Sequence, residues 1–496
     1  MRSMLMIAAL GLSLSLSVGC GCAKKAESSG ADSPKKDRAR GDGTPLASEW
    51  SDGPSSAAET KKFMPPSWGR DKDLAKETFA KDKAPSHKSS DKDAPPKTDP
   101  AVVTKGEIES KAPPVVAVAE AVTGVERTAK KAMPEQTLPS GILTAGSFDD
   151  NLEPAVFRSF VTGRGQRQDL GDLPGKLNGQ RLLVLVKDGA GKPLGGARVK
   201  LAAGPEGGVE IVTRADGRAV FMLSFDQLPA GAALTATVTP ADGSGVVTES
   251  IGAGLPRWEI TLAKARAQLP KLLDLAFVVD TTGSMGDELT HLKAEVKGIS
   301  AAIQKKFPEV QQRFALVLYR DEGDEYVTRA FDFTSSLDDF HKKLAAQTAA
   351  GGGDYPEAMH KGLEEANQLR WRDADVARVL FLIADAPPHG QHINCAMSAV
   401  NRLRQRGVGI YPVACSGYDD ACEFVMRSSA LLTGGRFLFL TDDSGVGNSH
   451  AEPKIPYYQV ERLERLMARM IAGELTGRTV EPAPADILRT VGRKIN

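Results

Sequence analysis

The sequence has few cysteines, few aromatic residues and no long apolar run, and each shortage excludes a class of protein. Five cysteines in 496 residues are too few for a chain held together by disulfides. Aromatic residues make up only 6% of the chain, whereas glycine occurs 49 times and proline 30 times, so many residues are expected in loops or linkers. No apolar run reaches the roughly 18 residues that a membrane-spanning helix needs.

The chain also lacks a net charge. Its 63 lysines and arginines are balanced by 63 aspartates and glutamates. Proteins that bind nucleic acids need clustered basic charge that is not compensated, so we expect no nucleic-acid partner. The hydrophobic content of 41% is sufficient for a folded core, and the length allows about three domains.

Residues 1–19 have the pattern of a secretory signal peptide. Arg2 precedes an apolar stretch from Met4 to Val18 that is too short to span a membrane. The stretch ends in Leu16-Ser17-Val18-Gly19-Cys20, which resembles a bacterial lipobox, although Leu16 lies one place earlier than usual. The resemblance implies that Cys20 is acylated and anchors the chain by lipid alone in the cell envelope, on the outer membrane if the cell is Gram-negative. Ordinary cleavage without acylation is the alternative.

Residues 20–137 are predicted to form a disordered tether. Between Ala23 and Pro100 there is no valine or isoleucine. The same stretch contains nine prolines, 16 basic residues and 14 acidic residues. Such a segment cannot bury enough apolar surface to offset the entropy lost on folding. Residues 138–180 show no clear periodicity and are interpreted as a poorly defined connecting segment.

Residues 181–264 are predicted to form a small β-sandwich. Short apolar or alternating runs such as Leu182–Val186 and Leu234–Thr239 are separated by glycine-containing turns, including Asp216-Gly217. The segment resembles carboxypeptidase-regulatory-like sandwich modules. It contains no catalytic constellation, so a spacer or secondary binding role is expected.

Residues 269–475 alternate between strand and helix patterns, which predicts an α/β domain with a doubly wound, mainly parallel sheet. Leu272–Val279 is an apolar run interrupted only by Asp274, as expected for a strand covered on both faces. Further strands are expected around 314–319, 326–333, 379–384, 408–414 and 436–440, and helices around 289–303, 337–346, 356–369, 393–406 and up to 432. The last helix is predicted over Tyr457–Ile471, and residues 476–496 are expected to be a C-terminal tail.

Side chains with oxygen donors follow three of these predicted strands or helices. Asp280, Thr282 and Ser284 come directly after the first strand, Asp354 and Glu357 lie in a glycine-rich loop, and Asp385 follows the strand ending at Ala384. Carboxylates and hydroxyls without soft ligands suit a hard cation, namely Mg²⁺, or else Ca²⁺ or Mn²⁺. The sequence therefore predicts a divalent-cation site at the carboxyl ends of the strands.

These residues resemble the von Willebrand factor type A (VWA) domain and its metal-ion-dependent adhesion site, whose first motif is Asp-x-Ser/Thr-x-Ser. The resemblance implies direct coordination by Thr282 and Ser284, with Asp280 acting largely through water. It also implies that Asp385 lies on the opposite side of the ion from these residues. Asp354-Tyr355-Pro356-Glu357 departs from the usual threonine position and is more similar to the Asp-x-Pro-Glu of integrin β subunits. That likeness implies Glu357 as the ligand, while Asp354 faces either the same ion or a neighbouring one.

The resemblance also implies a function. The ion would keep one coordination position for a carboxylate offered by a protein partner, so the chain is expected to be a binding protein and not an enzyme. Two alternatives remain: a VWA scaffold of an envelope complex with a purely structural metal, and a metal-dependent hydrolase using Asp280 and Asp385. The hydrolase is disfavoured because no nucleophile and base accompany these residues.

The remaining histidines and cysteines carry weaker signals. His389 and His392, with Cys395, are spaced as in some zinc sites, but four clear ligands are lacking. His389 and His392 are interpreted as residues at the rim of the cation site. Cys395, Cys415 and Cys422 could pair in three ways, and the sequence does not choose among them.

Overall fold

The structure is a computed structural model, and it describes residues 143–493 except 166, 206, 374 and 446–448. The predicted signal peptide, Cys20 and the whole predicted tether therefore lie outside the described residues, as do residues 138–142 of the predicted connecting segment. The described residues belong to one compact unit. They contain the predicted β-sandwich and the α/β domain, which are taken in turn below.

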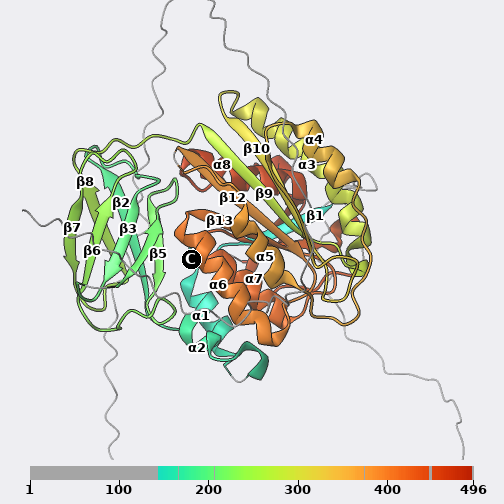
Figure 1. Cartoon of the computed structure of the whole chain (residues 1–496), viewed down its shortest axis with the longest axis horizontal. Helices are drawn as coiled ribbons and strands as arrows, with labels where there is room; N and C mark the ends of the chain where they lie inside the picture. The colour runs from blue at the N-terminus through green and yellow to red at the C-terminus, as the bar shows by residue number, and fades with distance from the viewer. Residues whose placement is uncertain (1–142, 166, 206, 374, 446–448, 494–496) are drawn as a thin grey trace, which may run out of the picture. The chain divides into compact units, whose positions relative to one another are not determined.

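The α/β domain is built on a nine-stranded sheet (Figure 1). Its strand order is β11-β10-β9-β12-β13-β14-β1-β15-β16, with β9 (Leu272–Asp280), β10 (Gln311–Tyr319), β11 (Thr328–Thr334), β12 (Val376–Ala384), β13 (Val408–Ala414), β14 (Phe437–Thr441), β1 (Thr144–Phe148), β15 (Tyr457–Arg462) and β16 (Arg489–Gly492). Strands β10, β9, β12, β13 and β14 are parallel to one another, and the others pair antiparallel. The prediction of a doubly wound, mainly parallel sheet is confirmed.

Helices cover both faces of this sheet (Figure 1). One face carries α3 (Gly286–Lys306), α4 (Leu337–Ala345) and α8 (Leu463–Thr476), and the other carries α1 (Pro154–Thr162), α2 (Leu173–Leu177), α5 (Met359–Gln368), α6 (Ile393–Gln405) and α7 (Asp420–Thr433). Alternate residues of β9 enter the two cores, because Phe277 packs under the first set and Val278 under the second. None of the helices in the described residues is long and apolar enough to cross a membrane.

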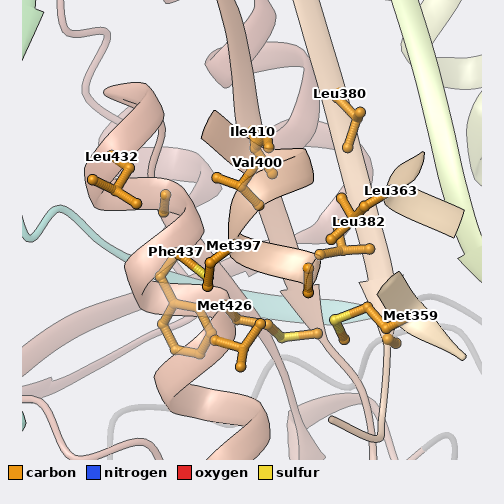
Figure 2. Packing of buried hydrophobic residues seen from close by; sticks show 14 of the residues in the cluster. Met359, Leu363, Leu380, Leu382, Met397, Val400, Ile410, Met426, Leu432 and Phe437 are labelled. Atoms are coloured by element: carbon orange, nitrogen blue, oxygen red, sulfur yellow. The ribbon is translucent and has the colours of Figure 1, made fainter. Parts of the chain in front are cut away.

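The core beneath α5, α6 and α7 fixes the starts of these helices. Figure 2 shows aliphatic and sulfur-containing side chains from the helices meeting residues of β12, β13 and β14, with the labelled set Met359, Leu363, Leu380, Leu382, Met397, Val400, Ile410, Met426, Leu432 and Phe437. Met359, the first residue of α5, is fully buried. Residues that precede or follow it at the sheet edge are therefore held in place by a packed core.

The middle segment folds into two sheets that share one apolar core, and their strands pair antiparallel except for β2 and β8, which are parallel. The three-stranded sheet has the order β5-β2-β8, and the four-stranded sheet has the order β4-β3-β6-β7. The strands are β2 (Arg181–Asp188), β3 (Arg198–Ala202), β4 (Val209–Val212), β5 (Arg218–Met222), β6 (Leu234–Thr239), β7 (Val247–Ile251) and β8 (Arg257–Leu262). In β6 the buried residues alternate with half-buried or exposed ones, as the period of two predicts.

Three elements differ from the sequence predictions. The predicted helix Tyr457–Ile471 is wrong in its first part, because Tyr457–Arg462 is strand β15, and the helix runs over Leu463–Thr476. The segment expected to be a poorly defined connection contains β1, which inserts between β14 and β15. The expected C-terminal tail contains β16, which pairs with β15. The physical reason is the same in each case, since long-range strand pairing decides these short segments.

The described residues also contain short 3₁₀ turns between the helices and strands. They are η1 (Gln168–Leu170), η2 (Gly283–Met285), η3 (Gly390–His392), η4 (Asp442–Ser444) and η5 (Pro484–Asp486). Two of them, η2 and η3, follow β9 and β12 closely and change the chain direction at the carboxyl ends of these central strands. They therefore shape the edge of the sheet where the candidate site lies.

A buried ion pair connects the sandwich segment with the α/β domain. The guanidinium of Arg404 in α6 donates to both carboxylate oxygens of Asp226, at 2.6 and 2.9 Å. It also donates to the carbonyl oxygen of Val220, and the side chains of Arg404 and Asp226 are almost completely buried. Removing one partner of such a pair leaves the other charge buried and unpaired.

We expect Asp226→Ala to lower the free energy of unfolding by about 3 to 5 kcal/mol, the usual cost of breaking a buried ion pair. Urea unfolding followed by circular dichroism measures this loss. The matched control is Glu210→Ala, which removes an exposed carboxylate from β4 and should change stability by less than about 0.5 kcal/mol. Equal effects of the two substitutions would show that the pair does not stabilise the fold.

Candidate metal centre

The candidate site lies where the strand order of the sheet reverses. Strand β9 pairs in parallel with β10 on one side and with β12 on the other. The carboxyl ends of β9 and β12 therefore meet at a topological switch point, the usual place for ligand sites in such sheets. Asp280 is the last residue of β9, and Asp385 directly follows β12.

A tight turn after β9 aligns the three residues of the first motif. One oxygen of Asp280, Oδ1, accepts the backbone N–H of Thr282 at 2.9 Å and its hydroxyl at 2.7 Å. The hydroxyls of Thr282 and Ser284 lie 3.4 Å apart. Asp280 and Thr282 are buried, whereas Ser284 is exposed. The other oxygen, Asp280 Oδ2, is buried without a hydrogen-bond partner among the described residues.

Glu357 reaches the same place from the loop before α5. Its backbone N–H donates to the carbonyl oxygen of Pro387 at 2.9 Å, which fastens this loop to the segment after β12. A methyl group added at Gly352 would lie 2.8 Å from Glu357 Oε1 and 3.2 Å from the Thr282 side chain, so Glu357 is a neighbour of Thr282. Within the described residues, Glu357 Oε2 and Asp385 Oδ1 are buried without hydrogen-bond partners.

The glycines of this loop are needed for its shape. Gly351 and Gly352 have φ angles of +82° and +76°, which other residues rarely adopt. The Asp324 carboxylate accepts the N–H of Gly352 at 2.9 Å and that of Asp321 at 3.0 Å. A side chain at Gly351 would collide with Asp324. The run of glycines therefore lets the loop pass close enough to bring Glu357 to the site.

The three buried carboxyl groups disfavour one another's charges. Burial, assisted by the charge of Asp385, raises the pKa of Asp280 to about 7. Burial and the charges of Asp280, Asp321, Asp324 and Asp385 raise the pKa of Glu357 to about 9. Burial also raises the pKa of Asp385, against a hydrogen bond from Ser284 that lowers it. The strongest charges acting on these groups are thus other carboxylates.

This arrangement fits a hard divalent cation. Asp280, Glu357 and Asp385 each keep a buried oxygen without a partner among the described residues, and Thr282 and Ser284 add hydroxyl oxygens beside them. Carboxylate and hydroxyl oxygens are the donors that Mg²⁺, Ca²⁺ and Mn²⁺ take. Gly283, Ser284 and residues 351–354 are exposed, so the donors can be reached from solvent on that side.

Asp354 is placed in a different group from the five residues above. It is exposed, and its carboxylate lies with Asp321 and His389 so that one donor atom of each is within 4.8 Å of the others. His389 Nε2 is 2.9 Å from Asp321 Oδ1. The structure therefore assembles Asp280, Thr282, Ser284, Glu357 and Asp385, and it sets Asp354 beside them.

The histidines at the rim have distinct surroundings. The His392 ring stacks on that of His360 with centroids 4.2 Å apart. Burial, assisted by the charge of His392, lowers the pKa of His360 to about 3, so His360 is neutral at physiological pH. His392 is grouped with His360 and Glu322, whereas the sequence interpretation had considered it beside Cys395. Cys395, Cys415 and Cys422 are buried, and the structure forms none of the three possible disulfide pairings among them.

Sequence reasoning missed several residues of this edge. Asp321 and Asp324 follow β10 and surround Glu357, and the rule applied to β9 and β12 would have found them. The Tyr355 hydroxyl lies 3.1 Å from the carbonyl oxygens of both Asp385 and Gly417, and it connects the loop to two strand ends. Neither contact can be read from residue spacing.

Comparisons with known proteins agree with this fold. The sequence profile of the von Willebrand factor A domain family matches residues 274–411, which include Asp280, Glu357 and Asp385. Among curated proteins, the chain is 31% identical over 190 residues to a RING finger protein named as ariadne-like from Acanthamoeba polyphaga mimivirus, covering 34% of this chain and 18% of that protein. It is 30% identical over 133 residues to alpha-protein kinase vwkA of Dictyostelium discoideum, covering 27% and 21%.

A third relative is von Willebrand factor A domain-containing protein 7 of Rattus norvegicus, 33% identical over 131 residues, with 26% of this chain and 14% of the relative covered. The matches thus span 14% to 21% of the three relatives' lengths. Among solved structures, BatB from Bacteroides thetaiotaomicron matches 41% of this chain and 98% of its own, with a TM-score of 0.29 and 11% identity. The proximal thread matrix protein 1 of the mussel byssus matches 32% and 40%, with a TM-score of 0.25 and 22% identity.

The raised pKa values predict how stability depends on pH without a metal. Asp280 and Glu357 have ordinary pKa values of 3.8 and 4.5, against about 7 and about 9 in the folded chain. Between these values the folded chain binds more protons than the unfolded chain, so the free energy of unfolding falls as the pH rises. In EDTA we therefore expect the urea concentration at the unfolding midpoint to decrease as the pH is raised from about 6 to about 9.

Glu357→Gln should weaken the dependence of stability on pH, since it removes one buried charge. Near pH 9 its free energy of unfolding should exceed that of the wild type by on the order of 1 to 3 kcal/mol. Glu309→Gln is the matched control, because Glu309 is exposed in the turn after α3 and should follow the wild type. A midpoint that stays constant or rises with pH in both proteins would contradict the burial of unpaired carboxylates.

Proposed function

We propose that this chain is a lipid-anchored protein of the cell envelope whose VWA-type domain binds a protein partner through a divalent cation. VWA domains generally mediate protein–protein interactions, and the domain match covers the strands that carry the candidate site. The observation that carries the proposal is a set of three buried carboxylate oxygens that have no hydrogen-bond partner among the described residues and that converge with two hydroxyl groups at the switch point.

In this proposal Thr282, Ser284 and Glu357 hold the ion directly, Asp280 acts largely through water, and Asp385 closes the far side. The bound ion would supply a coordination position for the partner's carboxylate. Mg²⁺ is the favoured ion because it keeps water molecules that a partner can replace, and Ca²⁺ and Mn²⁺ accept the same donors. Asp280 serves two roles, since its Oδ1 orients Thr282 while Oδ2 remains available.

The exposed residues around the site allow a partner to approach it from solvent. Ser284 and residues 351–354 surround the accessible side. The nearby carboxylates of Asp321, Asp324 and Asp354 would repel an acidic group in the absence of the ion. Binding is therefore expected to require the cation, which neutralises the site and gives the contact its direction.

The anchoring part of the proposal rests on the sequence. The lipobox-like residues that end at Cys20 favour acylation, and residues 20–137 would form the tether. A flexible chain of this length has a root-mean-square reach of roughly 60 Å, enough to hold the folded part away from the membrane surface. The anchor would be lipid alone, consistent with the absence of a spanning run in the sequence.

Calorimetric titration of Mg²⁺ into the EDTA-treated and dialysed full chain tests the site. We expect one ion to bind per chain and Ser284→Ala to weaken its affinity by about tenfold or more, because a direct oxygen donor is lost. Ser284 is exposed, so the substitution should leave the fold intact. Ser335→Ala, which removes another exposed hydroxyl, is the control. Mg²⁺ binding that is absent, or identical in Ser284→Ala and wild type, would refute the proposed site.

A second step separates metal-bridged binding from a scaffold with a structural ion. A partner isolated with the full chain in Mg²⁺ should be released by EDTA and should not be retained by Ser284→Ala. A partner retained equally in EDTA would refute the metal-bridged contact and favour the envelope scaffold.

Acylation can be tested with neighbouring cysteines. In a bacterial host fed radioactive palmitate, we expect the full chain to be labelled and to sediment with membranes. Cys20→Ser should abolish labelling and move the chain to the soluble fraction, whereas Cys22→Ser should leave both unchanged. Labelling that survives Cys20→Ser, or is lost equally in Cys22→Ser, would contradict the assignment of Cys20.

A further inference from the structure

A second group of potential ligands lies beside the candidate centre and is not used by it. Glu322 follows β10, His360 is the second residue of α5, and His392 ends the turn η3 before α6. One donor atom from each lies within 4.8 Å of the others. The three residues come from three chain segments that meet at the carboxyl edge of the sheet, so the fold itself brings them together.

His360 is the unusual member of this group. Its side chain is completely buried, and neither ring nitrogen has a hydrogen-bond partner among the described residues. A buried polar group left without a hydrogen-bond partner destabilises the fold. The packed core explains why His360 cannot turn away, because Met359 and Leu363 on either side of it in α5 are fixed beneath the helix (Figure 2). Its nitrogens therefore require a ligand that the described protein residues do not provide.

The neighbouring side chains indicate the kind of ligand. His392 stacks against His360 at 4.2 Å and is partly exposed, and Glu322 is exposed at the mouth of the group. Two imidazoles and one carboxylate are donors that suit Zn²⁺ and related transition metals, whereas Mg²⁺ and Ca²⁺ prefer oxygen donors alone. This donor set differs from the all-oxygen set of Asp280, Thr282, Ser284, Glu357 and Asp385.

We propose that Glu322, His360 and His392 form a second metal site, selective for Zn²⁺ or a similar borderline-soft divalent cation. Three protein donors leave at least one coordination position for water. The bound ion would fasten the start of α5 to the start of α6 and to the loop after β10. That loop also carries Asp321 and Asp324, so the second ion would fix the surroundings of Glu357 without replacing the first ion.

Titration of Zn²⁺ into the full chain in the presence of excess Mg²⁺ tests this site, because Mg²⁺ occupies all-oxygen donors. We expect one Zn²⁺ to bind per chain. His360→Gln, His392→Gln and Glu322→Gln should each weaken Zn²⁺ binding by about 100-fold or more, because each removes a direct ligand and the loss of an outer-shell partner already costs about 10- to 100-fold. Co²⁺ provides a second readout, since its visible spectrum should show nitrogen ligation that is lost in His392→Gln.

Three variants serve as matched controls. His291→Gln removes a partly buried histidine from α3, far from the group in sequence. His389→Gln removes the histidine of the neighbouring Asp321, Asp354 and His389 group, and Ser284→Ala weakens only the candidate Mg²⁺ site. All three should bind Zn²⁺ as the wild type does. A loss of Zn²⁺ binding in His389→Gln would place the ion in the neighbouring group and overturn the proposal.

The proposal is also overturned if the wild type binds no Zn²⁺ in excess Mg²⁺, or if His392→Gln binds it equally well. If His360→Gln fails to fold, the accessible Glu322 and His392 variants decide the question, since neither side chain is part of the apolar core. Failure of Zn²⁺ binding leaves the Mg²⁺ titration of Ser284→Ala unaffected, so the two sites are judged independently.

Discussion

The burial of Asp280, Glu357 and Asp385 together is the constraint on which the site depends. The carboxylates disfavour one another's charges, and each has a buried oxygen without a partner among the described residues. A fold tolerates such a cluster only when the surrounding structure determines it, because repulsion would otherwise drive the groups apart. Here two adjacent parallel strands and a glycine-rich loop hold them. In the proposed function, a bound cation would offset the cost of holding them together.

Much of the fold and of the candidate site could be predicted from the sequence. Predominantly apolar runs identified β9 and β12 because both faces of these strands are buried, and the residues that follow them had to lie at the same sheet edge. The five candidate ligands followed from that rule together with the family motif. The burial of His360 could not be predicted, since its position depends on how α5 packs, and the sequence gives no sign that its nitrogens lack partners.

The errors have a common physical origin. Tyr457–Arg462 runs into a true helix without a strong breaker, so local pattern extended the helix too far. What makes this segment a strand is pairing with β1 and β16, which come from distant parts of the chain. Tertiary pairing decides short segments of weak propensity. The same edge of the sheet also offers two chemically different donor sets, one of oxygens and one with imidazoles, which residue types alone did not separate.

The place of β1 has a consequence for how the molecule is made. Thr144 in β1 donates its hydroxyl to the carbonyl oxygen of Thr441 in β14, 297 positions later in the chain. The ribosome synthesises β1 long before β14 and β15, its two neighbours in the sheet. The sheet therefore cannot close during synthesis, and it is completed only after the C-terminal strands have emerged. The early strand β1 therefore remains without its two sheet neighbours until β14 and β15 have been synthesised.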